Sequence, residues 1–137
     1  MKLKNFYILV LITYLISFSN SYSIGQQNIK NVIQHKKAKK IDYIEFYNSK
    51  NEVFTLNNFK SDLVIINFWA TWCLPCREEM PSLSKLKLNK KFQEIDIIPI
   101  NIGGESFIKS EKFYKEFNIK NLSIFNGEIK KLSKVFK

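Results

Sequence analysis

Residues 64–77 read VIINFWATWCLPCR, and this stretch decides the fold of the chain. Its apolar first half belongs to the run Leu63–Trp69, which is typical of a strand buried on both faces. Its second half holds Cys73 and Cys76, the only two cysteines among the 137 residues. A C-x-x-C pair that follows a strand and opens a helix is the setting of reversible dithiol–disulfide chemistry. The stretch therefore predicts a redox-active site where a strand meets a helix.

The positions of the two cysteines predict different roles for them. A cysteine on the first turn of a helix faces unpaired backbone N–H groups and the positive end of the helix dipole, and both stabilise a thiolate. Cys73 is therefore the predicted nucleophile. Cys76, one turn further on the same side, can attack a mixed disulfide and release the partner. Pro75 is tolerated in a first helical turn and fixes the backbone there.

Half of a zinc site, or a pair of buried thiols, is the alternative interpretation of the two cysteines. The chain has no second cysteine pair, and its one histidine, His35, is far from the first in sequence. A four-ligand zinc site would therefore need carboxylates as well. A disulfide that closes so short a loop stabilises a fold little. We expect redox chemistry with no metal and no cofactor.

The composition is that of one small globular domain. Apolar residues make up 45% of the chain and charged residues 25%. The formal net charge of +10 comes almost entirely from lysine, because Arg77 is the only arginine. Arginine is the preferred residue for bidentate recognition of phosphates and bases. We therefore expect a solvated basic surface and no nucleic-acid partner.

The first 23 residues predict an export signal. Lys2 and Lys4 form a positively charged start, Phe6–Ile16 is apolar except for one threonine, and Ser21 and Ser23 suit a cleavage site. The apolar run is shorter than the roughly 20 residues that span a bilayer. The alternative is an uncleaved signal anchor, and only then would the chain be held at a membrane. Either way we expect an exported protein, in the bacterial periplasm or on the outer face of the cytoplasmic membrane.

Residues 24–40 are polar and basic and predict a spacer, and the folded domain is expected over 41–137. Strands that alternate with helices across short loops indicate an α/β layer fold. The expected elements are a β-hairpin over 41–46 and 52–56, strands over 63–69, 95–100 and 122–125, and helices over 78–91, 106–117 and 128–136.

The segment 67–81, NFWATWCLPCREEMP, resembles the active-site signature of the TlpA/ResA-type thioredoxin-like thiol:disulfide oxidoreductases. The hairpin, Asn58-Phe59-Lys60 and Ile98-Pro99-Ile100-Asn101 fit the same pattern, so that the resemblance covers residues 42–136. It implies a thioredoxin-like fold with an N-terminal β-hairpin and a central insert. It also implies disulfide reduction or exchange in exported proteins, often apocytochromes c that await haem, and a membrane or periplasmic redox partner.

The resemblance also implies roles for further residues near the cysteines. The family has a glutamate three residues after the second cysteine that tunes the thiols, and Glu79 occupies this position; the alternative is a solvated surface acid. Trp72, with Leu74 and Pro75, is expected to contact the substrate. Thioredoxin itself has a buried aspartate six residues before the first cysteine, where this chain has Asn67, which cannot transfer a proton. Trp69 is expected in the core.

The largest departure from the family concerns the C-terminal part of the domain. Family members place a cis-proline loop opposite the cysteines and follow it with two antiparallel strands and a helix. The prolines here are Pro75, Pro81 and Pro99, and none is placed for that role. We therefore expect a domain that lacks its C-terminal ββα portion, with residues 64–69 as an apolar edge strand that favours aggregation.

The motif and the resemblance leave three candidate functions. The leading one is a thiol:disulfide oxidoreductase that acts on the thiols and disulfides of exported proteins through Cys73 and Cys76, with cytochrome c maturation as one setting. The alternative is a non-catalytic product of a truncated or split gene. A peroxiredoxin-like peroxidase fits less well, because its cysteine usually follows a threonine by three residues, and Thr71 is only two residues before Cys73.

Overall fold

Five strands form one mixed sheet in the order β2-β1-β5-β4-β3. The computed structural model describes residues 36–37, 40–41, 43–92 and 94–135. The signal predicted over 1–23 lies outside the described residues, as does most of the spacer predicted over 24–40. The elements below belong to the unit formed by residues 39–137. Within the described residues, no helix has the length and apolar character needed to cross a bilayer.

The inner strands are parallel, and the hairpin is added to them in the opposite sense. β3 (Leu63–Trp69), β4 (Ile95–Asn101) and β5 (Phe125–Asn126) run parallel, whereas β1 (Phe46–Tyr47) is antiparallel to both β5 and β2 (Val53–Phe54). The predicted hairpin is thereby confirmed, but its strands are shorter than predicted: of the strand expected over 41–46, only Phe46 lies in β1. β3 lies at the edge of the described sheet, as expected for residues 64–69.

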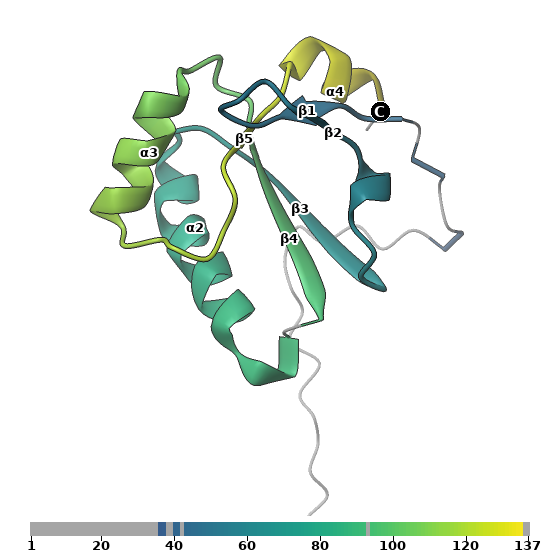
Figure 1. Cartoon of the computed structure of the whole chain (residues 1–137), viewed down its shortest axis with the longest axis horizontal. Helices are drawn as coiled ribbons and strands as arrows, with labels where there is room; N and C mark the ends of the chain where they lie inside the picture. Colours follow the sequence, from purple (N-terminus) through teal and green to yellow (C-terminus); the bar gives the residue numbers. More distant parts are fainter. Residues whose placement is uncertain (1–35, 38–39, 42, 93, 136–137) are drawn as a thin grey trace, which may run out of the picture. The chain divides into compact units, whose positions relative to one another are not determined.

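Helices lie on both faces of the sheet (Figure 1). α2 (Leu74–Leu88) and α3 (Phe107–Glu116) pack side by side on one face, and α4 (Ile129–Val135) packs against the other. Two short 3₁₀ turns, η1 (Leu56–Asn58) and η2 (Lys90–Phe92), precede β3 and β4. The α/β layer arrangement expected from the sequence is confirmed.

The side chains of the inner strands alternate between two cores, as parallel strands covered on both faces require. The core under α2 and α3 holds Trp69 and Ile97, and Trp69 is only 1% exposed, as predicted for this residue. The opposite core, under α4 and the hairpin, holds Ile98 and Ile100, which are fully buried. Both faces of β4 are therefore shielded from water.

Besides the hairpin, one helix and one strand differ by more than one residue from their predicted boundaries. The helix expected over 78–91 begins at Leu74 and ends at Leu88. The C-x-x-C pair had indicated a helix start near Cys73, but the apolar periodicity does not extend to this first turn, because Leu74 and Pro75 are exposed. The strand expected over 122–125 is shifted to β5, since Leu122 is buried in the core under α2 and α3 and only Phe125 and Asn126 enter the ladder.

Phe125 is the centre of an aromatic cluster, and its removal tests the core under α4. Its ring lies 4.9 Å from Phe46, 5.0 Å from Phe54 and 6.3 Å from Phe59, centroid to centroid. We expect Phe125→Ala to lower the free energy of unfolding by about 3–5 kcal/mol, because the neighbouring rings cannot fill the cavity. Urea denaturation measures the change. Ile108→Ala, at a position 63% exposed, is the control and should change stability by no more than about 0.5 kcal/mol.

Candidate active site

A tight turn connects β3 to α2 and presents the two cysteines. The Cys73 N–H donates to the Ala70 carbonyl oxygen at 3.2 Å, which closes the turn after Trp69. Cys73 is the N-cap of α2, with extended backbone angles, so it lies one residue before the first helical turn in which we expected it. Pro75 is the second helical residue, where its missing N–H leaves no helical hydrogen bond unmade.

A disulfide joins Cys73 to Cys76, whose Cα atoms are 5.3 Å apart. The two sulfur-bearing residues differ in burial: Cys73 is partly exposed, whereas Cys76 is 6% exposed and belongs to the core with Trp69 and Met80. The cysteine predicted to attack is therefore the one that a substrate can approach, and the cysteine predicted to resolve lies behind it.

The surface beside the disulfide is apolar. Trp72 is 71% exposed and Leu74 is 77% exposed, and Pro75 is exposed next to them. A hollow of about 130 Å³ adjoins these residues. Its walls come from the end of β3, the turn, the loop after β4 and the start of α4: Phe68, Trp69, Ala70, Trp72, Cys73, Cys76, Ile102 and Ile129.

The side chains of Glu79 and Asn67, which the comparison with the family singled out, have different surroundings. Glu79 is exposed on α2, one turn beyond Cys76, and its carboxylate forms no hydrogen bond or ion pair with another described residue. Its role in proton transfer stays a prediction. Asn67 is partly buried, and its Nδ2 donates to the Met80 sulfur at 3.4 Å. It thus lies against the helix that carries Cys76.

Glu105, which the sequence analysis missed, contacts the turn that carries the cysteines. Its carboxylate accepts hydrogen bonds from the Thr71 N–H at 2.8 Å, from the Thr71 hydroxyl, and from Asn101 Nδ2 at 3.2 Å. Partial burial raises the pKa of Glu105, but the hydrogen bonds from Thr71 and Asn101 and the charge of Lys109 together outweigh it, so the net pKa is lower than usual. The charged form of Glu105 is the one that the site favours.

The loop after β4 fits closely beneath the turn. The Ile102 N–H donates to the Trp69 carbonyl oxygen at 2.9 Å, and the Gly103 N–H donates to Asn101 Oδ1 at 2.8 Å. A Cβ atom at Gly103 would lie only 2.8 Å from the Cβ of Ala70. Only glycine therefore allows the loop to approach the turn this closely.

Arg77, directly after Cys76, ties α2 to α3. Its guanidinium carbon lies 4.8 Å from the ring centroid of Phe117 and 5.7 Å from that of Phe113, and its Nη2 pairs with the Glu116 carboxylate. The sole arginine of the chain therefore stacks on an aromatic face, a contact that lysine makes less well.

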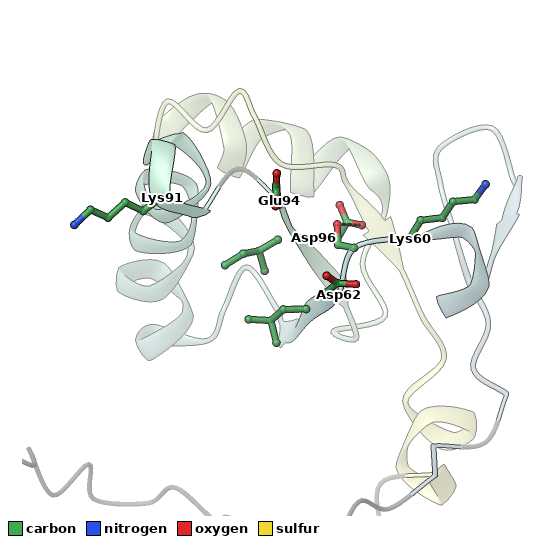
Figure 2. Close-up of a pocket in the computed structure, with 8 residues that line it drawn as sticks. Lys60, Asp62, Lys91, Glu94 and Asp96 are labelled. Atoms are coloured by element: carbon green, nitrogen blue, oxygen red, sulfur yellow. Dashed lines mark hydrogen bonds between the residues drawn. The ribbon is translucent and has the colours of Figure 1, made fainter.

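A larger hollow, of about 560 Å³, lies at the amino-terminal ends of β3 and β4 and is lined by charged residues, including Lys60, Asp62 and Glu94 (Figure 2). It is at the opposite end of the strands from the disulfide, about 20 Å away at the usual rise per residue. Asp96 there accepts a hydrogen bond from the Ser61 hydroxyl at 2.8 Å. The described residues contain no group of three His, Cys, Asp or Glu side chains that could hold a metal ion.

Comparison with known proteins then decides the family, because the redoxin pattern matches residues 27–135, most of the chain. The chain belongs to the redoxin family. Among its relatives, this redoxin is 36% identical over 70 residues to the thiol-disulfide oxidoreductase ResA of Geobacillus kaustophilus, a segment that covers 51% of this chain and 40% of that protein. It is 38% identical over 66 residues to the thioredoxin-like protein YneN of Bacillus subtilis, covering 48% of this chain and 37% of that protein. The matched segment thus spans well under half of each relative.

Solved structures confirm the thioredoxin-like fold of this redoxin. The thioredoxin domain of a thiol-disulfide oxidoreductase from Bacteroides vulgatus superposes with a TM-score of 0.60 at 20% identity, covering 75% of this chain and 72% of that one. A thioredoxin-family thiol:disulfide interchange protein from Chlorobium tepidum gives a TM-score of 0.58 at 19% identity, with 75% and 69% covered. With the ResA relatives, they confirm the resemblance to the TlpA/ResA type.

Gly103→Ala tests the close approach of the loop to the turn. The added methyl group would meet Ala70, which belongs to the backbone turn and cannot swing aside, so we expect a loss of about 1–3 kcal/mol in the free energy of unfolding. Gly104→Asn is the control: this position has a φ of +67° and no atom within 4 Å of an added Cβ. Asparagine tolerates such backbone angles, so the control should lose less than about 1 kcal/mol. Equal losses would contradict the steric explanation.

The lowered pKa of Glu105 predicts a pH dependence of stability. Because the folded state holds this carboxylate charged more strongly than the unfolded chain does, its contribution is fully present above its ordinary pKa of 4.5 and is lost as the pH falls through the lower folded value. In Glu105→Gln, stability should therefore fall less steeply than in the native chain between about pH 5 and pH 3. Thermal denaturation across this range measures both slopes, and parallel slopes would count against the assignment.

Proposed function

We propose that this redoxin is a thiol:disulfide oxidoreductase that works through Cys73 and Cys76. The observation that carries the proposal is the disulfide between a partly exposed cysteine at the start of a helix and a buried cysteine one turn further on. Relatives that are named thiol-disulfide oxidoreductases support the same reaction. A C-x-x-C pair with one accessible sulfur suits exchange better than it suits a structural cross-link.

In the reducing direction, the thiolate of Cys73 attacks one sulfur of a substrate disulfide. The substrate S–S bond breaks, a mixed disulfide forms, and the first substrate sulfur leaves as a thiolate. Cys76 then loses its proton and attacks the sulfur of Cys73, which re-forms the Cys73–Cys76 disulfide and releases the second substrate sulfur. Two electrons pass from the pair to the substrate, and the two released thiolates take up protons. The oxidising direction is the same sequence in reverse.

Local electrostatics support Cys73 as the attacking group. Cys73 is the N-cap of α2, so its sulfur lies at the positive end of the helix dipole, which stabilises negative charge. Glu79, one turn beyond Cys76 and open to water, is our candidate for accepting the proton that Cys76 must lose.

The substrate class that we propose is exported proteins with cysteines in apolar surroundings. Trp72, Leu74 and Pro75 offer them an apolar contact surface, and the hollow of about 130 Å³ next to the disulfide could take one apolar side chain of a bound segment. Apocytochromes c are the specific substrates that the family resemblance suggests. A membrane or periplasmic dithiol protein would restore the redox state of the pair after each turnover.

The location that we propose is outside the cytoplasm. The positively charged start, the short apolar run and the small residues of segment 1–23 support export. Solved relatives of the same fold include an exposed lipoprotein thioredoxin of Streptococcus pneumoniae, with a TM-score of 0.52 at 21% identity. In that compartment the reduced Cys73–Cys76 pair would exchange with the disulfides of other exported proteins.

Serine variants of the two cysteines separate the two chemical steps. With dithiothreitol as the reductant, Cys73→Ser should lower the rate of insulin reduction to that of dithiothreitol alone, because the attacking sulfur is gone. Prereduced Cys76→Ser, freed of dithiothreitol before insulin is added, should attack but fail to resolve, so that a covalent adduct of Cys73 with an insulin chain accumulates and is detected by mass spectrometry after acid quenching.

The control for these variants is Ser82→Ala, on the exposed side of α2, which should reduce insulin at the native rate. Full activity of Cys73→Ser would contradict the proposed reaction. An adduct on Cys76 in Cys73→Ser, with none on Cys73 in Cys76→Ser, would reverse the assignment of the two roles.

A further inference from the structure

The turn that carries the cysteines is bound by one carboxylate from another part of the chain. Both hydrogen-bond donors of Thr71 are used: its N–H donates to Glu105 Oε2 at 2.8 Å, and its hydroxyl donates to Glu105 Oε1. Thr71 lies two residues before Cys73, and Glu105 lies 34 residues further along the chain, in the loop between β4 and α3. A two-point contact of this kind fixes orientation as well as distance.

Glu105 in turn accepts hydrogen bonds from two buried side-chain amides. Asn101, which is 1% exposed, donates from Nδ2 to Glu105 Oε2 at 3.2 Å and to the Ser110 hydroxyl at 3.2 Å. Asn126, which is 7% exposed, donates from Nδ2 to the Glu105 carbonyl oxygen at 2.9 Å. These hydrogen bonds fix Glu105 to β4 and β5, so a movement of the Thr71 turn would break its hydrogen bonds to the carboxylate.

The charge of Glu105 is balanced mainly by neutral donors. Within the part of the chain that the structure describes, no cation lies within ion-pair distance of this carboxylate, and Lys109 acts on it only at longer range. Glu105 contacts Thr71, two residues before Cys73, and a charged carboxylate on that turn disfavours the thiolate form of the Cys73 thiol, because like charges repel.

We propose that Glu105 is a positioning residue for the Cys73–Cys76 pair, which holds the turn at Thr71 in the form seen with the disulfide closed and so shifts the redox equilibrium of the pair toward the disulfide. The proposal rests on the proposed function, since it assigns Glu105 a part in the same site. Two effects act in one direction. The hydrogen bonds stabilise the closed turn, and the negative charge disfavours the thiolate of the open form.

Equilibration of the full chain with glutathione buffers at pH 7 tests the redox effect. Glu105→Gln removes the charge and leaves one donor of Thr71 without an acceptor, so the equilibrium constant for reducing the pair should rise about tenfold. That factor corresponds to about 30 mV for two electrons. Thr71→Val keeps its N–H and the Glu105 charge but loses the hydroxyl, so it should give about a threefold rise.

Two matched variants serve as controls in the same assay. Thr71→Ser restores the hydroxyl and should return the equilibrium constant to within about twofold of the native value. Glu111→Gln removes a carboxylate from the exposed side of α3 and should also stay within about twofold. Native-like values for both Glu105→Gln and Thr71→Val would overturn the proposal, and so would an equal shift in Glu111→Gln.

A measurement on the native chain checks the contact independently of the variants. The Thr71 amide signal in a nitrogen–proton correlation spectrum should shift as Glu105 titrates, with a midpoint below the ordinary value of 4.5, and Glu105→Gln should abolish this shift. A Thr71 amide that does not respond between about pH 3 and pH 6 would overturn the proposal.

Failure of this proposal and failure of the proposed function give different results. In one outcome, the native chain reduces insulin, whereas Glu105→Gln and Thr71→Val have its equilibrium constant with glutathione. That outcome would support the oxidoreductase function and overturn the positioning role of Glu105. If the native pair does not exchange with insulin, the proposed function falls, while the glutathione equilibrium and the Thr71 titration still decide whether Glu105 biases the pair.

Discussion

Seven consecutive pairs hold β3 against β4 in parallel register, from Leu63 opposite Ile95 to Trp69 opposite Asn101. Because parallel strands end on the same side of a sheet, this register brings the cysteine turn after Trp69 next to the loop after Asn101. A shift of one residue would turn every side chain of β3 to the opposite face. The placement of Trp69 in the core and of Cys73 at the surface thus follows from a ladder of backbone hydrogen bonds.

The two faces of the sheet serve different purposes. The core under α2 and α3 includes Cys76, so the packing there determines how deeply the second sulfur is buried. The core under α4 is aromatic and aliphatic and fixes the hairpin against β5 through Phe46 and Phe125. α4 also brings Ile129 to the hollow beside the disulfide, so a helix whose buried side belongs to the structural core contributes to the surface around the redox pair.

Local signals in the sequence predicted most of the fold and the centre of the site. The apolar run 63–69 and the adjoining C-x-x-C pair are contiguous, so the strand, the turn and the cysteines could be placed by inspection. The C-x-x-C pair indicated a helix that starts near Cys73, but apolar periodicity did not reach the first turn of α2, because Leu74 and Pro75 are exposed there. β5 was misplaced because its two-residue length offers no period to count.

The contacts of Glu105 and Arg77 could not be predicted in the same way. Thr71 and Glu105 are 34 residues apart, and Arg77 and Glu116 are 39 apart, so that only the folded chain brings each pair together. One signal was present: Asn101 is a polar residue at the carboxyl end of an inner strand, and Glu105 follows it closely. In a parallel sheet such residues gather where the neighbouring strand ends, which here is the cysteine turn.

The unequal burial of the two sulfurs has a consequence for the regiochemistry of the disulfide. A foreign thiol can reach Cys73, while Cys76 is screened by Trp69, Met80 and the helices above them. Small adducts such as glutathione, and covalent thiol reagents, should therefore collect on Cys73. Cys76 attacks Cys73 from the buried side. The two disulfides that Cys73 can form are therefore made from different directions: a mixed disulfide with another molecule from solvent, and the disulfide with Cys76 from the core.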